Sequence, residues 1–455
     1  MHFRTTSFLV CHNRTSGPGD EQAVSGGCHS GAVASETGVQ GRVPWWRSVL
    51  TDVRPLQVSP PYRRLFFGNT IAQLGQQMTN VAVAVQVYTL THSSFYVGLV
   101  GVFALVPLVA LGLYGGAIAD AVDRRTLALL ASLGLWAVSI ALAVQAFAGN
   151  SSVWFPYACI AVQSGFYAVN NPARSAMVPR LLDKELLPAA SALNMASFNL
   201  GFTFGPMVGA LAIKWHGFGA AYAIDVVTFS AAYYALLRMP RMPPLENSPK
   251  AGLKSVVDGL RYLKRSPNLR MTFVVDLCAM VLAQPRALFP ALAYKVYAGG
   301  AGVVGVLQAA PAAGAVVAFL LSGWVSRIRM QGLAIVIAIV AYGAVVGGVG
   351  LTDVLWIGVV FLALSGAADM VSAAYRSTIL QVAAPDQLRG RLQGVFIVVV
   401  AGGPRAGDFL AGSVASATGE RLALVLGGLA CVVGVLTAAA LQRGFLGYDA
   451  RHPTP

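Results

Sequence analysis

The sequence predicts an all-α membrane protein with twelve transmembrane helices in two six-helix, pseudo-symmetric bundles. Of the 455 residues, 56% are hydrophobic and only 11% are charged, a balance typical of polytopic membrane proteins. Continuous apolar stretches of roughly 18 to 25 residues recur along the chain, and each can cross a bilayer as a helix. Because these runs are continuous rather than alternating, they favour helices over a β-barrel. Motifs of the first half also recur in the second.

Most breaks between the predicted spans contain only a few residues, which favours antiparallel neighbours. The stretch from Arg238 to Arg270 is the one long break, and it separates six spans from six. The boundaries are placed to within about three residues. The predicted spans are 65–90, 94–119, 126–148, 152–173, 189–213, 218–237, 271–294, 301–325, 331–350, 354–375, 393–415 and 421–441.

The spans and the polar stretches divide the chain into five predicted regions. These are an N-terminal extension (1–58), a first six-helix bundle (59–238), a linker (239–269), a second six-helix bundle (270–442) and a tail (443–455). The extension is rich in Gly, Ser, Thr and Arg and lacks the apolar core of a signal peptide, so we expect it to be disordered. The next Met after Met1 is Met78, within the first span. An over-extended reading frame is therefore an alternative to a native extension.

The linker contains a predicted amphipathic helix. Its apolar face holds Leu253, Val256, Val257, Leu260 and Leu263, and its polar face holds Lys254, Asp258, Arg261 and Lys264. Such a helix can lie on the inner membrane surface. A soluble helix packed on the cytoplasmic face of the protein is an equally good interpretation.

The positions of the 32 Lys and Arg residues predict the orientation in the membrane. Positively charged loops are retained in the cytoplasm, and here basic residues concentrate in alternate breaks between spans. Both termini are therefore predicted to be cytoplasmic. The formal charge of +14 follows from this sorting, so no nucleic-acid partner is expected. The basic residues of the alternate breaks are Arg124, Arg125, Arg174, Arg180, Lys184, eight from Arg238 to Arg270, Arg327, Arg329, Arg376, Arg389 and Arg391.

Internal repeats support two duplicated halves. The segment 174–178 (RSAMV) matches 376–380 (RSTIL), an offset of 202 residues, and 205–209 (GPMVG) matches 403–407 (GPRAG). Parallel repeats of this kind place a substrate site between the halves at mid-depth, and rocking of one half against the other gives alternating access.

The charged hinge after the second span resembles the helix 2–3 signature of the major facilitator superfamily. The resemblance implies a lock that stabilises the outward-facing state. Ala121 stands where that family usually has a basic residue, and Asp123 where it usually has Gly. A positive-inside stop signal is the alternative interpretation. The residues of the predicted lock are Gly116, Asp120, Asp123, Arg124 and Arg125.

The fifth span contains Gly201, Gly205, Pro206 and Gly209, which resemble the glycine-proline motif of the exporter branch of the superfamily. Glycines four residues apart also permit close helix packing without any direction of transport. The pattern from Arg63 to Arg443 resembles the enterobactin-exporter-like and multidrug-efflux branch. This resemblance implies a monomeric transporter in the inner membrane of a bacterium.

Polar side chains in spans 1, 4 and 5 predict the lining of a substrate cavity, since they would be costly in lipid. In span 1 they recur at helical spacing on one face. Each of them alone could instead form an interhelical hydrogen bond. The predicted cavity residues are Asn69, Gln73, Gln77, Asn80, Gln163, Tyr167, Asn170 and Asn194.

Four charged residues within the second-half spans are candidates for proton coupling: Asp276, Asp369, Arg405 and Asp408. Asp276 is the first choice, because no basic residue lies one turn away in sequence to hold it ionised. Arg405 and Asp408 are three residues apart and can neutralise each other. A structural ion pair with another helix is the alternative for Asp276.

These observations predict a proton-coupled exporter of small amphipathic organic molecules, either drugs or siderophores. The chain contains no Gly-x-x-x-x-Gly-Lys-Ser/Thr loop and no cluster with metal-ligand spacing, so an ATP-driven pump, an enzyme, a cofactor and a metal are not expected. An importer and a non-transporting membrane sensor or scaffold of the same fold are the alternatives.

Overall fold

The computed structural model describes residues 52–242, 261–322, 328–383 and 386–449, with the side chains of these ranges except 113–121 and 386–398. Every regular element in these ranges is a helix, which confirms the all-helical prediction. The predicted extension lies outside the described residues up to position 51. Residues 54–58, which were predicted to be disordered, form the short helix α2 (Arg54–Val58). Asp52 accepts hydrogen bonds from Arg54, and Pro55 pre-sets the first turn.

Six predicted spans of the first half correspond to five helices. The fifth and sixth lie within one long element, α8, whose backbone leaves helical geometry at Gly217 (φ 77°). Glycine tolerates this positive φ, so the chain turns there without strain. The short elements α7 (Val178–Leu181) and η1 (Lys184–Leu186) precede α8. The long helices are α3 (Pro60–Thr91), α4 (Ser94–Ala121), α5 (Arg124–Phe147), α6 (Trp154–Ser175) and α8 (Leu187–Leu237).

The second half repeats this arrangement, and each of its six predicted spans corresponds to helical structure. A short turn, η6 (Arg443–Gly447), follows the last span. The helices are α10 (Pro267–Leu277), α12 (Gly300–Leu320), α13 (Gln331–Val349), α14 (Leu355–Ala383), α15 (Asp386–Thr418) and α16 (Glu420–Leu441).

Most of the predicted linker helix lies outside the described residues. Leu263, at the end of its apolar face, is buried in the main hydrophobic cluster.

Local sequence explains several helix ends. Ser59 begins α3, because its hydroxyl accepts a hydrogen bond from the Tyr62 backbone N–H at 3.2 Å and Pro60 follows it. Asp123 begins α5 in the same way, accepting from Thr126 N–H at 2.8 Å. Gly419, at φ 86°, separates α15 from α16.

Hydropathy alone finds only part of this architecture. In the described part of the chain, eight segments are long and apolar enough to cross a membrane. The helices α3, α6 and α15 are not among them, although they pack between apolar helices. Their sequences carry many of the polar residues predicted to line the cavity or to couple protons. Polar residues in a span are costly in lipid and tolerable beside a water-filled space.

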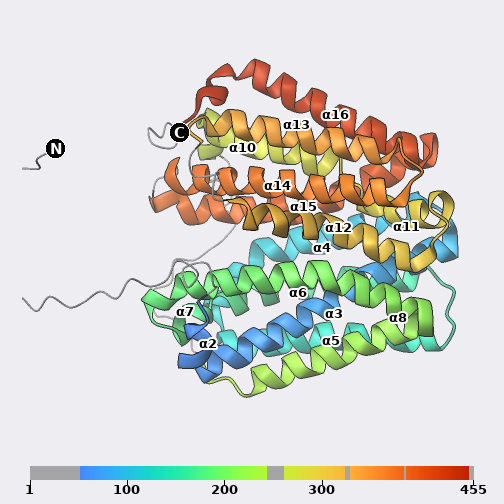
Figure 1. Ribbon diagram of the computed structural model, residues 1–455. Coiled ribbons are helices and arrows are strands. Elements are labelled where there is room, and N and C mark those ends of the chain that lie inside the picture. The colour runs from blue at the N-terminus through green and yellow to red at the C-terminus, as the bar shows by residue number, and fades with distance from the viewer. Residues whose placement is uncertain (1–51, 243–260, 323–327, 384–385, 450–455) are drawn as a thin grey trace, which may run out of the picture. The chain divides into compact units, whose positions relative to one another are not determined.

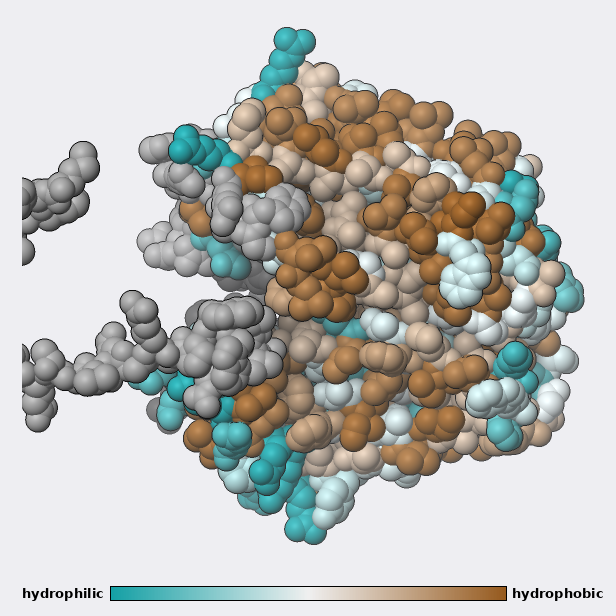
Figure 2. Space-filling view, viewed as in Figure 1, coloured by the Kyte–Doolittle hydropathy of each residue, from teal (hydrophilic) through white to brown (hydrophobic). Residues whose placement is uncertain are grey.

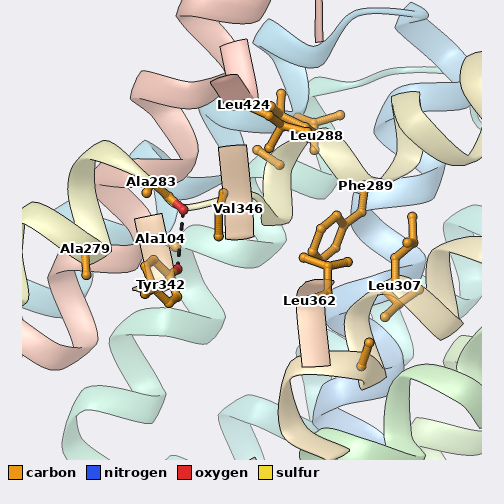
Figure 3. Packing of buried hydrophobic residues seen from close by; sticks show 14 of the residues in the cluster. Ala104, Ala279, Ala283, Leu288, Phe289, Leu307, Tyr342, Val346, Leu362 and Leu424 are labelled. Carbon is orange, nitrogen blue, oxygen red and sulfur yellow. Dashed lines mark hydrogen bonds between the residues drawn. The ribbon is translucent and has the colours of Figure 1, made fainter. Parts of the chain in front are cut away.

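The seventh span is broken at mid-depth. After α10 come a π-helical turn, η2 (Cys278–Leu282), the non-helical residues 283–285, a 3₁₀ turn, η3 (Arg286–Leu288), α11 (Phe289–Ala291) and a second π turn, η4 (Leu292–Val296). Pro285 cannot donate a helical hydrogen bond, which favours the break. The freed carbonyl of Ala283 accepts from the Tyr342 hydroxyl at 3.3 Å, as the dashed line in Figure 3 shows. Phe289 packs beside Leu307 and Leu362 (Figure 3).

The two halves meet mainly along two helix pairs, α4 with α15 and α8 with α12 (Figure 1). In both pairs the contact is made by small residues. A Cβ built on Gly98 of α4 would lie 2.6 Å from the Asp408 carbonyl oxygen of α15, and one on Gly305 of α12 would lie 2.5 Å from Ala210 Cβ of α8. The pairs are equivalent under the internal repeat, since spans 2 and 5 of the first half correspond to spans 8 and 11 of the second.

The face shown in Figure 2 is largely apolar between polar ends. The exposed large hydrophobic residues of the described chain include Leu320, Leu321 and Trp356. A contiguous apolar surface of this kind is expected where lipid tails cover the protein.

Two buried arginines correct the sequence-based boundaries. Arg174 and Arg376 were assigned to cytoplasmic breaks, but they lie within α6 and α14 and are only 8% and 4% exposed. Both helices therefore extend beyond their apolar runs. Hydropathy could not show this, because the partners that stabilise these charges come from other helices.

The glycines of the fifth span pack α8 against α3 inside the first half. Added Cβ atoms on Gly201, Gly205 and Gly209 would lie 2.7 Å from Gln73 Cγ, 2.6 Å from Gln77 Cβ and 2.9 Å from Met78 Cα. The close approach therefore sets the position of two polar residues on α3.

We expect Gly205→Ala to destabilise the protein by about 1–3 kcal/mol, because the new methyl group overpacks against α3. Gly112→Ala is the matched control, since no atom lies within 4 Å of a Cβ there. Thermal unfolding of the purified variants in one detergent measures the effect. Equal midpoints for the two variants would contradict the packing assigned to Gly205.

Candidate functional site

A cavity of about 450 Å³ lies at mid-depth between the halves. We term it the central cavity. It is bounded by α3, α4, α6 and α8 of the first half and by η3, α12 and α15 of the second. Its polar lining consists of Gln73, Gln76, Gln77, Asn80, Gln163, Ser164, Tyr167, Asn171, Arg286, Gln308, Arg405 and Asp408.

A second cavity of about 250 Å³ adjoins it within the first half. We term it the inner vestibule. The two cavities share Gln73, Tyr167, Asn171 and Phe198 in their walls, and the vestibule continues past Tyr62 and Ser175. These last residues lie at the end of the bundle predicted to face the cytoplasm, here termed the inner end. The polar space therefore leads from mid-depth toward the inner end.

The opposite, outer end is closed between the halves. Glu420, the first residue of α16, accepts a hydrogen bond through one oxygen from Ser94 of α4 at 3.1 Å and from Lys295 at 2.7 Å. The rings of Tyr88 and Tyr294, one from each half, lie 5.7 Å apart. The glycine contacts of α4 with α15 and of α8 with α12 lie just below. The described contacts therefore close the outer end between the halves, while the polar space extends from mid-depth toward the inner end.

All eight residues predicted to line a cavity lie in the wall of one of these two spaces. Gln73, Gln77, Asn80, Gln163 and Tyr167 face the central cavity. The vestibule wall includes Asn69, Asn170 and Asn194, along with Gln73 and Tyr167. Substrate contact by these residues stays a prediction.

Two of them also serve structure. Arg174 donates to Asn69 at 3.0 Å, to Asn170 at 3.2 Å and to Ser132 at 3.0 Å. Asn69 is on α3 and Arg174 is on α6. The alternative given above for each cavity residue, an interhelical hydrogen bond, is therefore correct for Asn69.

The predicted neutralisation of Arg405 by Asp408 is wrong: no ion pair joins them, although both side chains are described. Asp408 instead accepts a hydrogen bond from the Ala287 backbone N–H at 3.2 Å, at the break in the seventh span. Arg405 donates to the Ala401 carbonyl one turn earlier. Three-residue spacing made the pair possible, but the free N–H beside Pro285 provides a partner for the carboxylate.

Asp276 has a cationic partner that its neighbours in sequence do not reveal. Arg376 of α14 pairs with Asp276 of α10, and it also lies 3.3 Å from Asp369 on its own helix. No basic residue lies one turn from Asp276 in sequence, as stated above, but a cation from another helix pairs with it, so the alternative of an ion pair with another helix is correct. The side chains of Asp276 and Arg376 are 2% and 4% exposed, whereas that of Asp369 is 34% exposed. Two carboxylates and one guanidinium leave one negative charge in this cluster, here termed the Arg376 cluster.

The first half contains the repeat equivalent of this cluster without its acids. Arg174 corresponds to Arg376 at the offset of 202 residues, and its bonded partners are two amides and a hydroxyl. Asn69, on the first helix of the first half, accepts a hydrogen bond from Arg174. Asp276, on the first helix of the second half, forms an ion pair with Arg376. The duplicated halves thus place an arginine at equivalent sites and differ in whether the partner can bind a proton.

Comparison with known proteins identifies the family. The family model described as a transmembrane secretion effector matches residues 51–444. This chain belongs to that family of the major facilitator superfamily. It is 29% identical over 392 residues to the enterobactin exporter EntS of Citrobacter koseri, covering 84% of this chain and 94% of the relative. It is 29% identical over 403 residues to EntS of Shigella boydii, covering 87% and 95%.

Solved structures confirm the major facilitator fold. A POT family transporter in complex with 5-aminolevulinic acid superposes with a TM-score of 0.70 at 12% identity, covering 85% of this chain and 97% of that one. The nucleoside transporter NupG gives 0.67 at 13% identity, covering 84% and 99%. The predicted family and fold are therefore confirmed, and the chain is a multi-pass transporter rather than an enzyme.

The described members of the family's helix 2–3 signature bond within the first half. Asp123 accepts from the Met242 N–H at 2.8 Å, Arg124 donates to the Ala176 carbonyl at 3.0 Å, and Arg125 donates to the Leu237 carbonyl at 2.8 Å. The side chains of Gly116 and Asp120 lie outside the described residues. These bonds tie α5 to the ends of α6 and α8, and a lock between the halves stays a prediction.

Three important residues were not among the predicted site residues. Arg286 is an isolated charge in an apolar span directly after Pro285, which is a usable signal for a broken helix. Arg376 could have been inferred from its repeat partner Arg174. Gln308 stands alone as a polar residue in α12, and only the fold shows that it faces the cavity.

A bulky residue at Gly98 should keep the outer end open. The Cβ site lies 2.6 Å from the Asp408 carbonyl oxygen and 3.2 Å from Gly412 Cα, so Gly98→Leu separates α4 from α15. Spin labels at Ser151 and Leu351, in a background without native cysteines, should move apart by several ångströms in this variant. Gly112→Leu should leave the distance unchanged. A wild-type distance in Gly98→Leu would show that this contact does not close the outer end.

Asp123 should stabilise the inner end in a pH-dependent way. Burial raises the pKa of this carboxyl, but hydrogen bonds from the Thr126 and Met242 N–H groups outweigh burial and hold the pKa below its usual value. The stabilisation is therefore present above the unfolded pKa of about 4 and is lost as pH falls below it. Thermal unfolding should show Asp123→Ala less stable than wild type at pH 7, with the difference shrinking as pH falls below about 4 and through the lowered pKa of the folded state. A difference that is the same at pH 7 and at pH 3 would mean that the charge is not responsible.

Proposed function

We propose that this chain is a proton-coupled exporter of small amphipathic organic molecules, drugs or siderophores, that works by alternating access. The observation that carries the proposal is the central cavity between the halves, closed at the outer end and continuous with a polar vestibule toward the inner end. A substrate entering from the inner end reaches mid-depth without crossing lipid. Opening of the outer contacts and closing of the inner end then release it on the other side.

Export is favoured over import by family and motif. The family model describes secretion, and the relatives named above are exporters of enterobactin. The glycine-proline segment of α8 packs against α3 within the first half. It also packs against α12 of the second half. An importer would pass through the same inward-facing state, so the conformation alone does not determine direction.

The cavity suits a drug-sized amphipathic substrate. Its volume of about 450 Å³ falls within the range of roughly 300–1,000 Å³ common for such ligands. Its wall combines aliphatic side chains with amide groups that can donate or accept hydrogen bonds. Amides and aromatic rings give modest selectivity, which fits a transporter that accepts related compounds.

The Arg376 cluster is the best-supported coupling site. Its one excess negative charge is costly at this depth, and binding of one proton neutralises it. Asp369 is partly exposed and provides a route for the proton to the buried Asp276. Pairing of Arg376 with Asp276 links α14 to α10, whereas pairing with Asp369 stays within α14. A change in protonation that shifts Arg376 between the two carboxylates therefore changes how these helices are held together. Asp408, at the break in the seventh span, is the second candidate.

Transport by reconstituted protein tests the proposal. Proteoliposomes should transport members of an amphipathic panel in a manner that collapses with the pH gradient. Asp276→Asn should abolish gradient-driven transport while leaving substrate binding intact, because Asp369 and Arg376 then balance each other and no excess negative charge is left for a proton to neutralise.

Asp353→Asn is the matched control, since Asp353 pairs with Arg421 in an exposed position at the outer end. It should transport at the wild-type rate. Normal gradient-driven transport by Asp276→Asn would overturn the coupling assignment. Transport of the whole panel without any effect of the pH gradient would overturn proton coupling itself.

A further inference from the structure

We propose that the central cavity selects organic anions carrying an aromatic ring, and that Arg286 binds the anionic group. The inference rests on the proposed function, in that the central cavity is taken as the substrate site. It adds the charge of the substrate, which the family membership leaves open.

Arg286 occupies the position in the cavity best suited to a ligand. It follows Pro285 at the break of the seventh span, and its side chain is exposed within a wall whose neighbours Gln284 and Ala287 are buried. Broken spans at mid-depth are where transporters of this architecture expose groups to substrate. The break thus aims a guanidinium into the space between the halves.

No carboxylate forms an ion pair with Arg286 among the described residues. Its guanidinium instead lies 5.6 Å from the centre of the Phe202 ring, which stabilises the charge but leaves its N–H donors available. Asp408 lies three residues after Arg405 in α15. Its carboxylate accepts a hydrogen bond from the Ala287 N–H and forms no ion pair with Arg286 or Arg405. A planar acid can therefore accept two hydrogen bonds from Arg286.

The described lining of the path carries more basic than acidic side chains. The central cavity contains Arg286 and Arg405 against one carboxylate, Asp408. The vestibule adds Arg174, whose bonded partners are all neutral. Asp408 and Asp369 act on Arg286 electrostatically without forming an ion pair with it. A bound anion therefore provides the direct partner that this guanidinium lacks, and a cationic substrate would be repelled by it.

The remaining wall specifies the body of the ligand. The Phe202 ring lies beside Arg286, Phe198 packs against Phe202, and Tyr167 is part of the same wall. Val83, Val97 and Val100 make another part of the wall apolar. Such a wall gains little from a small inorganic anion, which would leave most of the space unfilled. An aromatic ring joined to an acidic group satisfies both the guanidinium and the apolar surface.

Equilibrium binding to the purified full-length protein in lipid nanodiscs tests the inference. Three ligands share one naphthalene ring and differ in charge: naphthoate, naphthamide and naphthylmethylammonium. Wild type should bind naphthoate about tenfold more tightly than the amide, because charge-assisted bonds are the stronger ones, and the ammonium most weakly. Arg286→Gln should lose this preference while binding the amide as before, and Arg286→Lys should keep part of it.

Arg421→Gln removes the same charge at the outer end and should leave all three affinities unchanged. The inference is overturned if wild type binds naphthoate no more tightly than the amide, or if Arg421→Gln weakens naphthoate as much as Arg286→Gln does. Because binding is measured without a gradient, a protein that selects the anion but shows no gradient-driven transport would refute the proposed function alone. Gradient-driven transport without anion selectivity would refute this inference alone.

Discussion

The cost of holding charge away from water organises this protein. Each charged or strongly polar side chain within the spans must find a partner or face a hydrated space, and the structure uses both solutions. Asp225, fully buried, accepts hydrogen bonds at 2.7 Å from Thr79 and Ser139, so two neighbouring helices are tied to α8. Asp276 pairs with Arg376, and Arg174 is satisfied by amides. Arg286 and Arg405 border the central cavity. The polar groups that lipid would exclude thus define both the internal ties of each half and the space between them.

The contact between the halves has a different character. Among the described residues, glycines and alanines bring the backbones of the two halves close together, and the Tyr88–Tyr294 and Phe95–Phe409 ring contacts and the hydrogen bond from Ser94 to Glu420 add to this contact. Such an interface gains mainly dispersion energy and leaves few buried polar groups unsatisfied when it separates. The ties within each half are hydrogen bonds and ion pairs to buried residues, which are costly to break. This difference explains why rigid halves that part along a small-residue seam are the expected mode of motion.

Equivalent positions in the two duplicated halves have different bonding partners. Arg174 and Arg376 occupy the same place in the two halves, yet only the second has carboxylate partners. Repeat matching identified the pair as a duplication, but the functional difference lies in Asn69 and Asp276, each of which is at least 100 residues from either arginine. Likewise, the three-residue spacing of Arg405 and Asp408 suggested neutralisation, whereas the break beside Pro285 offered the carboxylate a backbone N–H instead. The spacing of residues along one helix shows which contacts are possible. Competition with groups from other helices determines which of these contacts forms.

The sequence by itself determined the membrane class, the order of the spans, the duplication and eight of the polar residues around the two cavities, because each depends on local composition and helical periodicity. The family followed from the resemblance of its motifs. The partner of Asp276, the exposure of Arg286 at a broken helix and the closure of the outer end were decided only by the tertiary structure. These features depend on which helices meet and at what height, which is set by packing between segments far apart in the chain. Hydropathy misplaced Arg174 and Arg376 for the same reason: their burial is tolerable only because distant side chains satisfy them.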